Sequence, residues 1–125
     1  MDIKRTNFKF LNDDKYITMT RGDTLSFGIE LLDENDEAFT TNLASAFFTC
    51  KHNHTDATNI FRKSLGNGIT RTGTGQYVVR VAPNDTKDVE AGKYFYDLQI
   101  GINSDVFTIL KGVLEIEQDV TGGVA

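Results

Sequence analysis

The sequence predicts an all-β fold, an antiparallel β-sandwich of about seven strands with a short N-terminal extension. Two observations support this prediction. Apolar residues alternate with polar ones over several short runs, as they do in strands that bury one face. Eleven glycines fall mostly between these runs, where turns are needed, and there is a single proline, Pro83. No long stretch shows the 3.6-residue period of an amphipathic helix, so a helical fold is excluded.

The first two predicted strands span residues 16–20 and 24–32, with a turn at residues 21–23 between them. From residue 24 to residue 31 the second strand alternates regularly, because every second residue is apolar and the others are polar or glycine. We therefore expect one of its faces to be buried. That face would consist of Leu25, Phe27, Ile29 and Leu31.

The middle of the chain predicts three more strands. A polar connection that begins with the acidic turn 33–37 leads to a strand at 46–52. A weaker strand at 60–65 is followed by glycine-rich turns and then by a strand at 76–81. The polar segment 83–92 is a longer connection with room for one helical turn. The expected inward faces are Ala46, Phe48, Cys50 and His52 in one strand, and Tyr77, Val79 and Val81 in another.

Two strands, at residues 93–100 and 105–117, complete the predicted sandwich. They are preceded by Glu90-x-Gly92-x-Tyr94, which resembles the acid-x-Gly-x-Tyr corner of immunoglobulin-like sandwiches. In that corner the tyrosine hydroxyl bonds back to the preceding connection. The sequence therefore predicts a sandwich of the immunoglobulin-like type.

A chain of 125 residues fits one domain with a single hydrophobic core. We expect an N-terminal arm at residues 1–14, the sandwich at 15–121 and a flexible tail at 122–125. The only cysteine is Cys50, so no disulfide can form within the chain.

Charge and hydropathy exclude several kinds of partner. The formal net charge of −5 argues against nucleic acid, because neutralising phosphates requires a basic face. No apolar stretch is long enough to span a bilayer, and the N-terminus lacks the apolar segment of a signal peptide. We therefore expect no membrane partner and synthesis in a cytoplasm.

Two segments have the residue types of a metal site. Cys50, His52 and His54 would suit zinc, but ligands two residues apart on one strand rarely complete a tetrahedron and a fourth ligand is not evident. Residues 33–37 are rich in carboxylates, but they lack the glycine and distal glutamate of an EF-hand loop. We therefore predict no metal, with Cys50 as a small buried hydrophobic residue and 33–37 as a solvated turn.

No catalytic machinery is evident in the sequence. The two histidines lie close together without an orienting acid, and no Ser–His–Asp arrangement stands out. The glycines at 66, 68, 73 and 75 do not form a phosphate-binding loop, because no Lys-Ser/Thr pair follows them. We therefore predict no catalytic residues, no cofactor and no enzymatic activity.

The last strand predicts an interaction surface. Its even positions carry Val106, Leu110, Leu114 and Ile116, which keep one face apolar. Its odd positions carry Phe107, Ile109 and Val113 in the first half, and then Glu115 and Glu117. A half-strand that is apolar on both faces suggests that something covers its outer face. The cover would be the N-terminal arm or a neighbouring subunit. The predicted interaction residues are Phe107, Ile109 and Val113 on the strand, and Phe8 and Phe10 on the arm.

Three short motifs punctuate the chain: ITMTRGDT at 17–24, GKYFYDLQI at 92–100 and GVLEIEQDVT at 112–121, with Asp85-Thr86 between the first two. Together they resemble tail and baseplate proteins of phages that infect Gram-positive bacteria, above all the N-terminal immunoglobulin-like domain of baseplate upper proteins. The resemblance covers roughly residues 16–121. It implies a virion structural protein made in a bacterial cytoplasm, which assembles with other tail or baseplate proteins and as a homo-oligomer. Because no receptor-binding region follows the last strand, we expect an accessory or connector role.

The alternative is a ligand-binding module for cell-surface carbohydrate. It depends on Tyr94, Tyr96, Asp97 and Gln99, which would offer aromatic faces for stacking and polar groups for hydroxyls. Both tyrosines are in phase with the expected core, which favours the structural interpretation.

Overall fold

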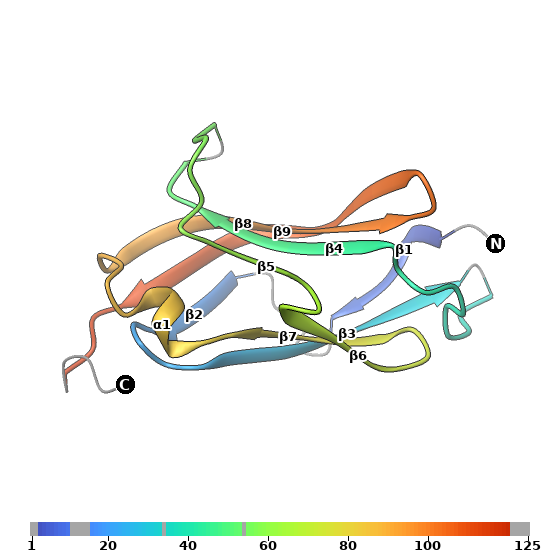
Figure 1. The fold of residues 1–125 in the computed structure, drawn as a ribbon, viewed down its shortest axis with the longest axis horizontal. Helices are drawn as coiled ribbons and strands as arrows, with labels where there is room; N and C mark the ends of the chain where they lie inside the picture. Colours follow the sequence, from blue (N-terminus) through green and yellow to red (C-terminus); the bar gives the residue numbers. More distant parts are fainter. Residues whose placement is uncertain (1–2, 11–15, 34, 54, 121–125) are drawn as a thin grey trace.

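The computed structural model describes residues 16–33, 35–53 and 55–120 in full and the backbone of residues 3–10. In this part of the chain, nine β-strands and one short helix, α1 (Pro83–Thr86), form a two-layered sandwich (Figure 1). The predicted all-β sandwich is confirmed, and it contains β1 and β6 in addition to the predicted strands. The strands are β1 (Ile3–Phe10), β2 (Tyr16–Thr20), β3 (Leu25–Asp33), β4 (Ser45–Lys51), β5 (Phe61–Leu65), β6 (Gly68–Gly73), β7 (Gln76–Val81), β8 (Gly92–Ile102) and β9 (Asp105–Glu117).

Backbone hydrogen bonds join the strands in the order β1-β3-β7-β6-β5-β4-β8-β9-β2. In Figure 1, β4, β8 and β9 lie in one layer, above β3, β6 and β7 in the other. β5 and β6 link the layers through a short parallel pairing, with Ser64 opposite Gly68 and Leu65 opposite Ile69. The two layers are therefore connected along one side of the sandwich.

The N-terminal segment contributes one edge strand to each layer. β1 pairs antiparallel with β3, and β2 pairs in parallel with β9. The sequence predicts an arm at residues 1–14, outside the sandwich, whereas the backbone of Ile3–Phe10 belongs to the sheet order. A strand such as β3 would otherwise expose a row of N–H and C=O groups, which β1 pairs. The predicted tail, residues 122–125, lies outside the described residues.

The core lies between the layers and follows the predicted alternation. The inward positions of β3, β4, β7 and β8 are apolar and mostly buried, while the positions between them are more exposed. Phe48 is central: its side chain is fully buried, and its ring lies 5.3 Å from that of Phe27, 5.9 Å from Phe61 and 5.3 Å from Tyr96, between centroids. Other fully buried residues include Leu31, Ile69, Val79, Val81, Leu98 and Leu114.

Helix α1 occupies the connection in which the sequence allows one helical turn. Pro83 begins it, a position where the missing N–H is harmless. The carboxylate of Asp85 accepts a hydrogen bond of 2.7 Å from the backbone N–H of Ala82 and pairs with the Lys63 ammonium at 2.6 Å. α1 is the only helix among the described residues, and it is too short to cross a bilayer.

The predicted tyrosine corner is present. The Tyr94 hydroxyl donates a hydrogen bond to the backbone carbonyl oxygen of Glu90, four residues earlier. The Tyr94 side chain is buried, and its ring lies near the exposed His52. The corner fixes the path of the chain into β8, and it supports the immunoglobulin-like type of the sandwich.

Replacing Tyr94 with phenylalanine is expected to lower the free energy of unfolding by about 1 kcal/mol, because the corner hydrogen bond is lost while the ring stays in place. Tyr16→Phe is the matched control. Its hydroxyl donates to the Glu115 carboxylate at an exposed site, where water replaces the lost partner, so little change is expected. Denaturant unfolding of both variants measures the difference, and equal losses would contradict the structural role of the corner.

Candidate interaction surface

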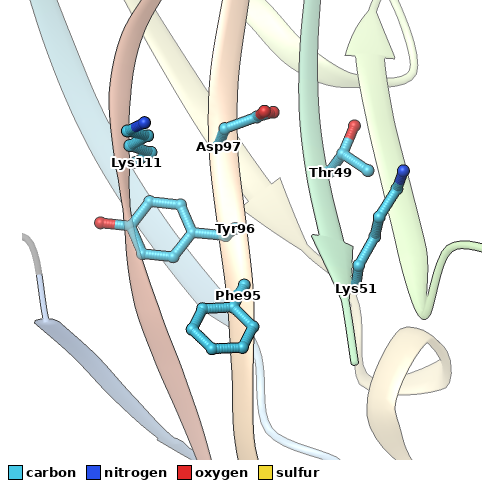
Figure 2. Close-up of a pocket in the computed structure, with 6 residues that line it drawn as sticks. All are labelled: Thr49, Lys51, Phe95, Tyr96, Asp97 and Lys111. Atoms are coloured by element: carbon cyan, nitrogen blue, oxygen red, sulfur yellow. The ribbon is translucent and has the colours of Figure 1, made fainter. Parts of the chain in front are cut away.

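Four strands of one layer present a row of polar side chains on the outer face of the sandwich. The residues between core positions point outward, so Thr49 on β4 lies opposite Asp97 on β8, which lies opposite Lys111 on β9. Arg62 on β5 extends the row on the other side of Thr49. Lys51, two residues after Thr49, lies on the same face (Figure 2). Strand register therefore brings together residues that are up to sixty-two positions apart in the sequence.

This face is hollowed in two adjoining places. A depression of about 90 Å³ is lined by Thr49, Lys51, Phe95, Tyr96, Asp97 and Lys111. A larger one, of about 290 Å³, shares Thr49, Lys51 and Asp97 with the first and is completed by Phe47, Ala57, Asn59, Arg62 and Gln99. Because they share three residues, we treat the two depressions as one site, the outer-face hollow.

The outer-face hollow is cationic although the chain is acidic. Lys51, Arg62 and Lys111 line it together with a single carboxylate, Asp97, whereas the whole chain has a formal net charge of −5. Within the described part of the chain, Lys51 and Lys111 form no ion pair. Arg62 places its guanidinium 4.1 Å from the centre of the Phe47 ring, a cation–π contact. The hollow therefore presents positive charge on the outer face of the sandwich.

Apolar groups border the cationic residues. Phe47 and Phe95 are half-buried on the outer face, and Phe95 lies opposite Val113 of β9. Val113 in turn lies opposite Tyr16 of β2, whose side chain is 41% exposed. Aromatic residues and arginine are enriched in protein–protein interfaces. This composition is typical of a surface that binds another protein.

The structure separates the predicted interaction residues. Val113 lies on the outer face, but Phe107 lies opposite the buried Ile100 and packs partly buried against the core. A β-bulge explains the change of phase: Leu98 faces Leu110 and Gln99 faces Thr108, so one residue, Ile109, is inserted in the ladder and also packs against the core. Apolar residues therefore occur at both odd and even positions of β9 for two reasons. The bulge changes which positions face the core, and Val113 is an apolar residue on the outer face. The side chains of Phe8 and Phe10 lie outside what the structure describes; their backbone forms part of β1.

The residues of the carbohydrate hypothesis are also divided. Tyr94 and Tyr96 are 5% and 3% exposed, so neither offers a ring face to a sugar. Asp97 and Gln99 point outward and line the hollow. Sequence reasoning missed Lys51, Arg62 and Lys111. The sequence shows only that each of them lies between core positions and so points outward. Which of them become neighbours depends on the register between strands.

The predicted metal ligands do not converge. Cys50 is fully buried and His52 is exposed, while His54 lies outside the described residues. In the acidic turn, the buried Asp33 accepts hydrogen bonds from the backbone N–H groups of Asn35 and Glu37, at 2.8 and 3.1 Å. No group of three His, Cys, Asp or Glu side chains in the described part of the chain is placed to hold a metal ion.

The Cys50 thiol is expected to be unreactive in the folded protein and fully reactive after unfolding. Burial raises its pKa from 9.0 to about 12, so the thiol is neutral as well as shielded. Because the folded pKa is raised, this contribution to stability is complete below pH 9.0 and decreases as the pH rises toward about 12. Labelling with a thiol reagent, with and without denaturant, measures the effect. Rapid labelling of the folded protein would contradict it.

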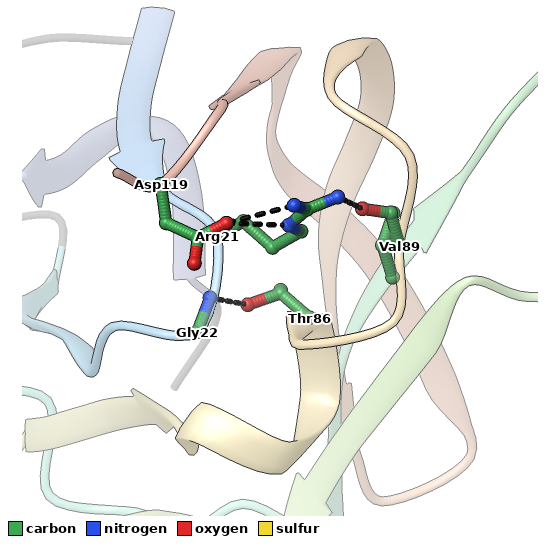
Figure 3. A network of polar contacts seen from close by, with 5 residues as sticks. All are labelled: Arg21, Gly22, Thr86, Val89 and Asp119. Carbon is green, nitrogen blue, oxygen red and sulfur yellow. Dashed lines mark hydrogen bonds and ion pairs between the residues drawn. The ribbon is translucent and has the colours of Figure 1, made fainter. Parts of the chain in front are cut away.

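Residues of the first and last sequence motifs and Thr86 meet at one end of the sandwich (Figure 3). Arg21 pairs with Asp119 at 2.8 Å, and the backbone N–H of Gly22 donates to the Thr86 hydroxyl at 2.9 Å. Arg21 also donates to the carbonyl oxygen of Val89 at 3.4 Å. These contacts tie the turn after β2 to the α1 connection and to the chain after β9. The first and last motifs and Asp85-Thr86 therefore share a structural role in closing this end.

No protein-family model matches the chain, and no curated protein matches it either. Solved structures with a similar fold include the Lin-41 filamin domain, with a TM-score of 0.51 and 16% identity over 92% of this chain and 96% of that one. The adhesin InvE of Yersinia pseudotuberculosis gives a TM-score of 0.53 and 16% identity over 93% of this chain. The endo-β-1,4-mannanase of Thermotoga petrophila gives 0.57 and 9% identity over 90% of this chain.

The chain spans 20% of the mannanase and 28% of the adhesin, so in both cases it is similar to one part of a larger protein. At identities of 16% or less, the similarity shows the fold alone. It establishes an immunoglobulin-like β-sandwich as the fold of this chain.

Proposed function

We propose that the protein is a non-enzymatic structural protein of a phage virion, a tail or baseplate accessory or connector that acts by binding other proteins. The observation that carries this proposal is the outer-face hollow with its half-buried aromatic border. A sheet face that combines Phe47, Phe95 and Arg62 has the composition of an interface rather than of a catalytic cleft. Many weak contacts between copies or neighbours would then give a stable assembly.

Two further observations support the proposal. Residues from the first and last of the motifs that resemble tail and baseplate proteins, with Thr86 of the Asp85-Thr86 pair, supply contacts that close one end of the sandwich: Arg21 with Asp119 and Gly22 with Thr86. In addition, among the described residues, the thiol of Cys50 and the imidazole of His52 are not placed as a nucleophile and its base. Cys50 is buried with a raised pKa, and His52 is exposed.

The test is to look for the protein in purified particles of the phage or prophage that encodes it. Antibodies raised against the purified chain should detect it in particles that have been separated from free protein, in an amount comparable to known tail components. If the protein is absent from such particles and monomeric in isolation, the proposal fails.

Carbohydrate binding is the second candidate, favoured by the polar lining of the larger depression. Thr49, Asn59, Asp97 and Gln99 place hydroxyl, amide and carboxylate groups where they could bind sugar hydroxyls. The stacking surface is small, because Arg62 lies over the Phe47 ring. Binding on a glycan array that is lost in the Asp97→Ala and Gln99→Ala variants would favour this candidate over assembly.

A further inference from the structure

The chain carries an acidic turn that is complementary in charge to the outer-face hollow. The turn follows β3 and exposes Asn35, Asp36 and Glu37. Its backbone is held by Asp33, whose N–H donates to the carbonyl oxygen of Glu37 at 2.7 Å and whose carboxylate accepts from two N–H groups of the turn. Asp36 and Glu37 therefore present exposed carboxylates on backbone that is hydrogen-bonded to Asp33, so little backbone entropy would be lost when they bind.

The acidic turn and the hollow lie on different sides of the molecule. The acidic turn follows the last residue of β3, at the end of the sandwich where β4 begins. Lys51 is the last residue of β4, which runs toward the opposite end (Figure 1). The hollow opens on the outer face of the β4 and β8 layer. One copy therefore presents an acidic projection and a cationic depression in different directions.

We propose that the outer-face hollow binds the acidic turn of a second copy of this chain, with Asp36 and Glu37 placed against Lys51 and Lys111. The partner is a second copy because the chain itself supplies both charges, and Lys51 and Lys111 form no ion pair within one copy's described residues. Such a contact joins two different surfaces, so it propagates from copy to copy into a ring or a filament. The inference rests on the proposed function, because virion parts are built from repeated contacts of this kind.

The first measurement is self-association by sedimentation velocity at low and high salt. Wild-type protein should associate, and more weakly at high salt, because salt screens exposed charges. The face variant, K51E with K111E, and the turn variant, D36N with E37K, should each associate at least about tenfold more weakly. Asparagine replaces Asp36 because this residue has φ +61°, a conformation that asparagine tolerates.

Matched controls make the same charge changes elsewhere. R71E with R80E reverses two exposed cations on β6 and β7, in the other layer, and D88N with D105K alters two exposed carboxylates away from the turn. Both controls should associate like wild type. If they weaken association as much as the test variants do, net charge is responsible and the proposal is wrong.

Mixing the two test variants gives the decisive result. Each variant alone should repel itself, but an equimolar mixture should associate, because every face then meets a turn of opposite charge. Both variants keep a net negative charge, so recovery cannot come from overall attraction. A monomeric wild type, or a mixture that stays unassociated, would overturn the proposal. If the protein is nevertheless found in virions, the proposed function stands and only this contact is rejected.

Discussion

Replacing Phe48 with alanine is expected to lower the free energy of unfolding by about 3 to 5 kcal/mol. The Phe48 side chain is fully buried, and its ring contacts those of Phe27, Phe61 and Tyr96, which come from three other strands. These strands are held in place by the sheet, so the cavity left by the ring would close only in part. Such a loss is a large fraction of the roughly 5 to 15 kcal/mol that stabilise a domain.

Phe47→Ala is the matched control for this prediction. Phe47 is the preceding residue on the same strand, but it points to the outer face and is only half-buried. Its removal loses a partly exposed ring and the cation–π contact of Arg62, so a loss of about 1 kcal/mol is expected. Denaturant unfolding compares the variants. Equal losses would mean that the two faces of β4 are assigned wrongly.

Gly75→Ala is expected to lower the free energy of unfolding by about 2 to 4 kcal/mol. This loss is the sum of two costs, a side chain on a left-handed backbone and overpacking around the new Cβ atom. Gly75 has φ +68°, and a Cβ atom there would lie 2.8 Å from the carbonyl oxygen of Leu31 and 3.0 Å from the backbone nitrogen of Phe39. Both neighbours are backbone atoms in a hydrogen-bonded crossing, since Leu31 donates to Gly75 and Phe39 donates to Leu31. They cannot move aside as a flexible side chain would.

Gly66→Ala separates the two causes. Gly66 has a comparable φ of +88°, but nothing lies within 4 Å of the Cβ position. Its replacement should therefore cost only the conformational term, about 1 to 2 kcal/mol. Thermal or denaturant unfolding of both variants gives the difference, which measures the crowding at Gly75. If Gly66→Ala is the more destabilising of the two, the crossing is not as tight as described.

The sequence was sufficient for the elements that alternate strongly. β3, β4, β7 and β8 lie close to their predicted limits, because each buries one face against the same core and the register follows from that burial. The tyrosine corner was predicted too, since its geometry depends on a few neighbouring residues around Tyr94. Local patterns of this kind carry their own structural signal.

Three features depended on tertiary pairing and were not predicted. β6 begins and ends with glycine and buries only Ile69, so its strand character comes from pairing with β5 and β7. β1 belongs to the sheet because its backbone pairs with the edge of β3. The bulge at Ile109 shifts the phase of β9 without any mark in the sequence. In each case a partner strand determines the structure.

The candidate site shows the same limit. The sequence indicated an outer surface near Val113, which the structure places on the outer face. Lys51, Arg62 and Lys111 come together only when three strand pairs are aligned, so no spacing in the sequence reveals them. Asp97 was singled out for sugar binding, and its position in the row is explained by the same register.

The central claim is that the outer face contacts another protein in an assembled particle, and thiol labelling of Thr49→Cys tests it most directly. The native Cys50 is buried and should remain unlabelled, so the labelling reports the new thiol in the hollow. In purified particles Thr49→Cys should react at least about tenfold more slowly than in isolated protein that is diluted until it is monomeric, and recover when the particles are dissociated. Arg80→Cys, on the other layer, reports whether the reagent reaches the protein at all. If Thr49→Cys reacts equally fast in particles and in isolated protein, the outer face is not the contact surface.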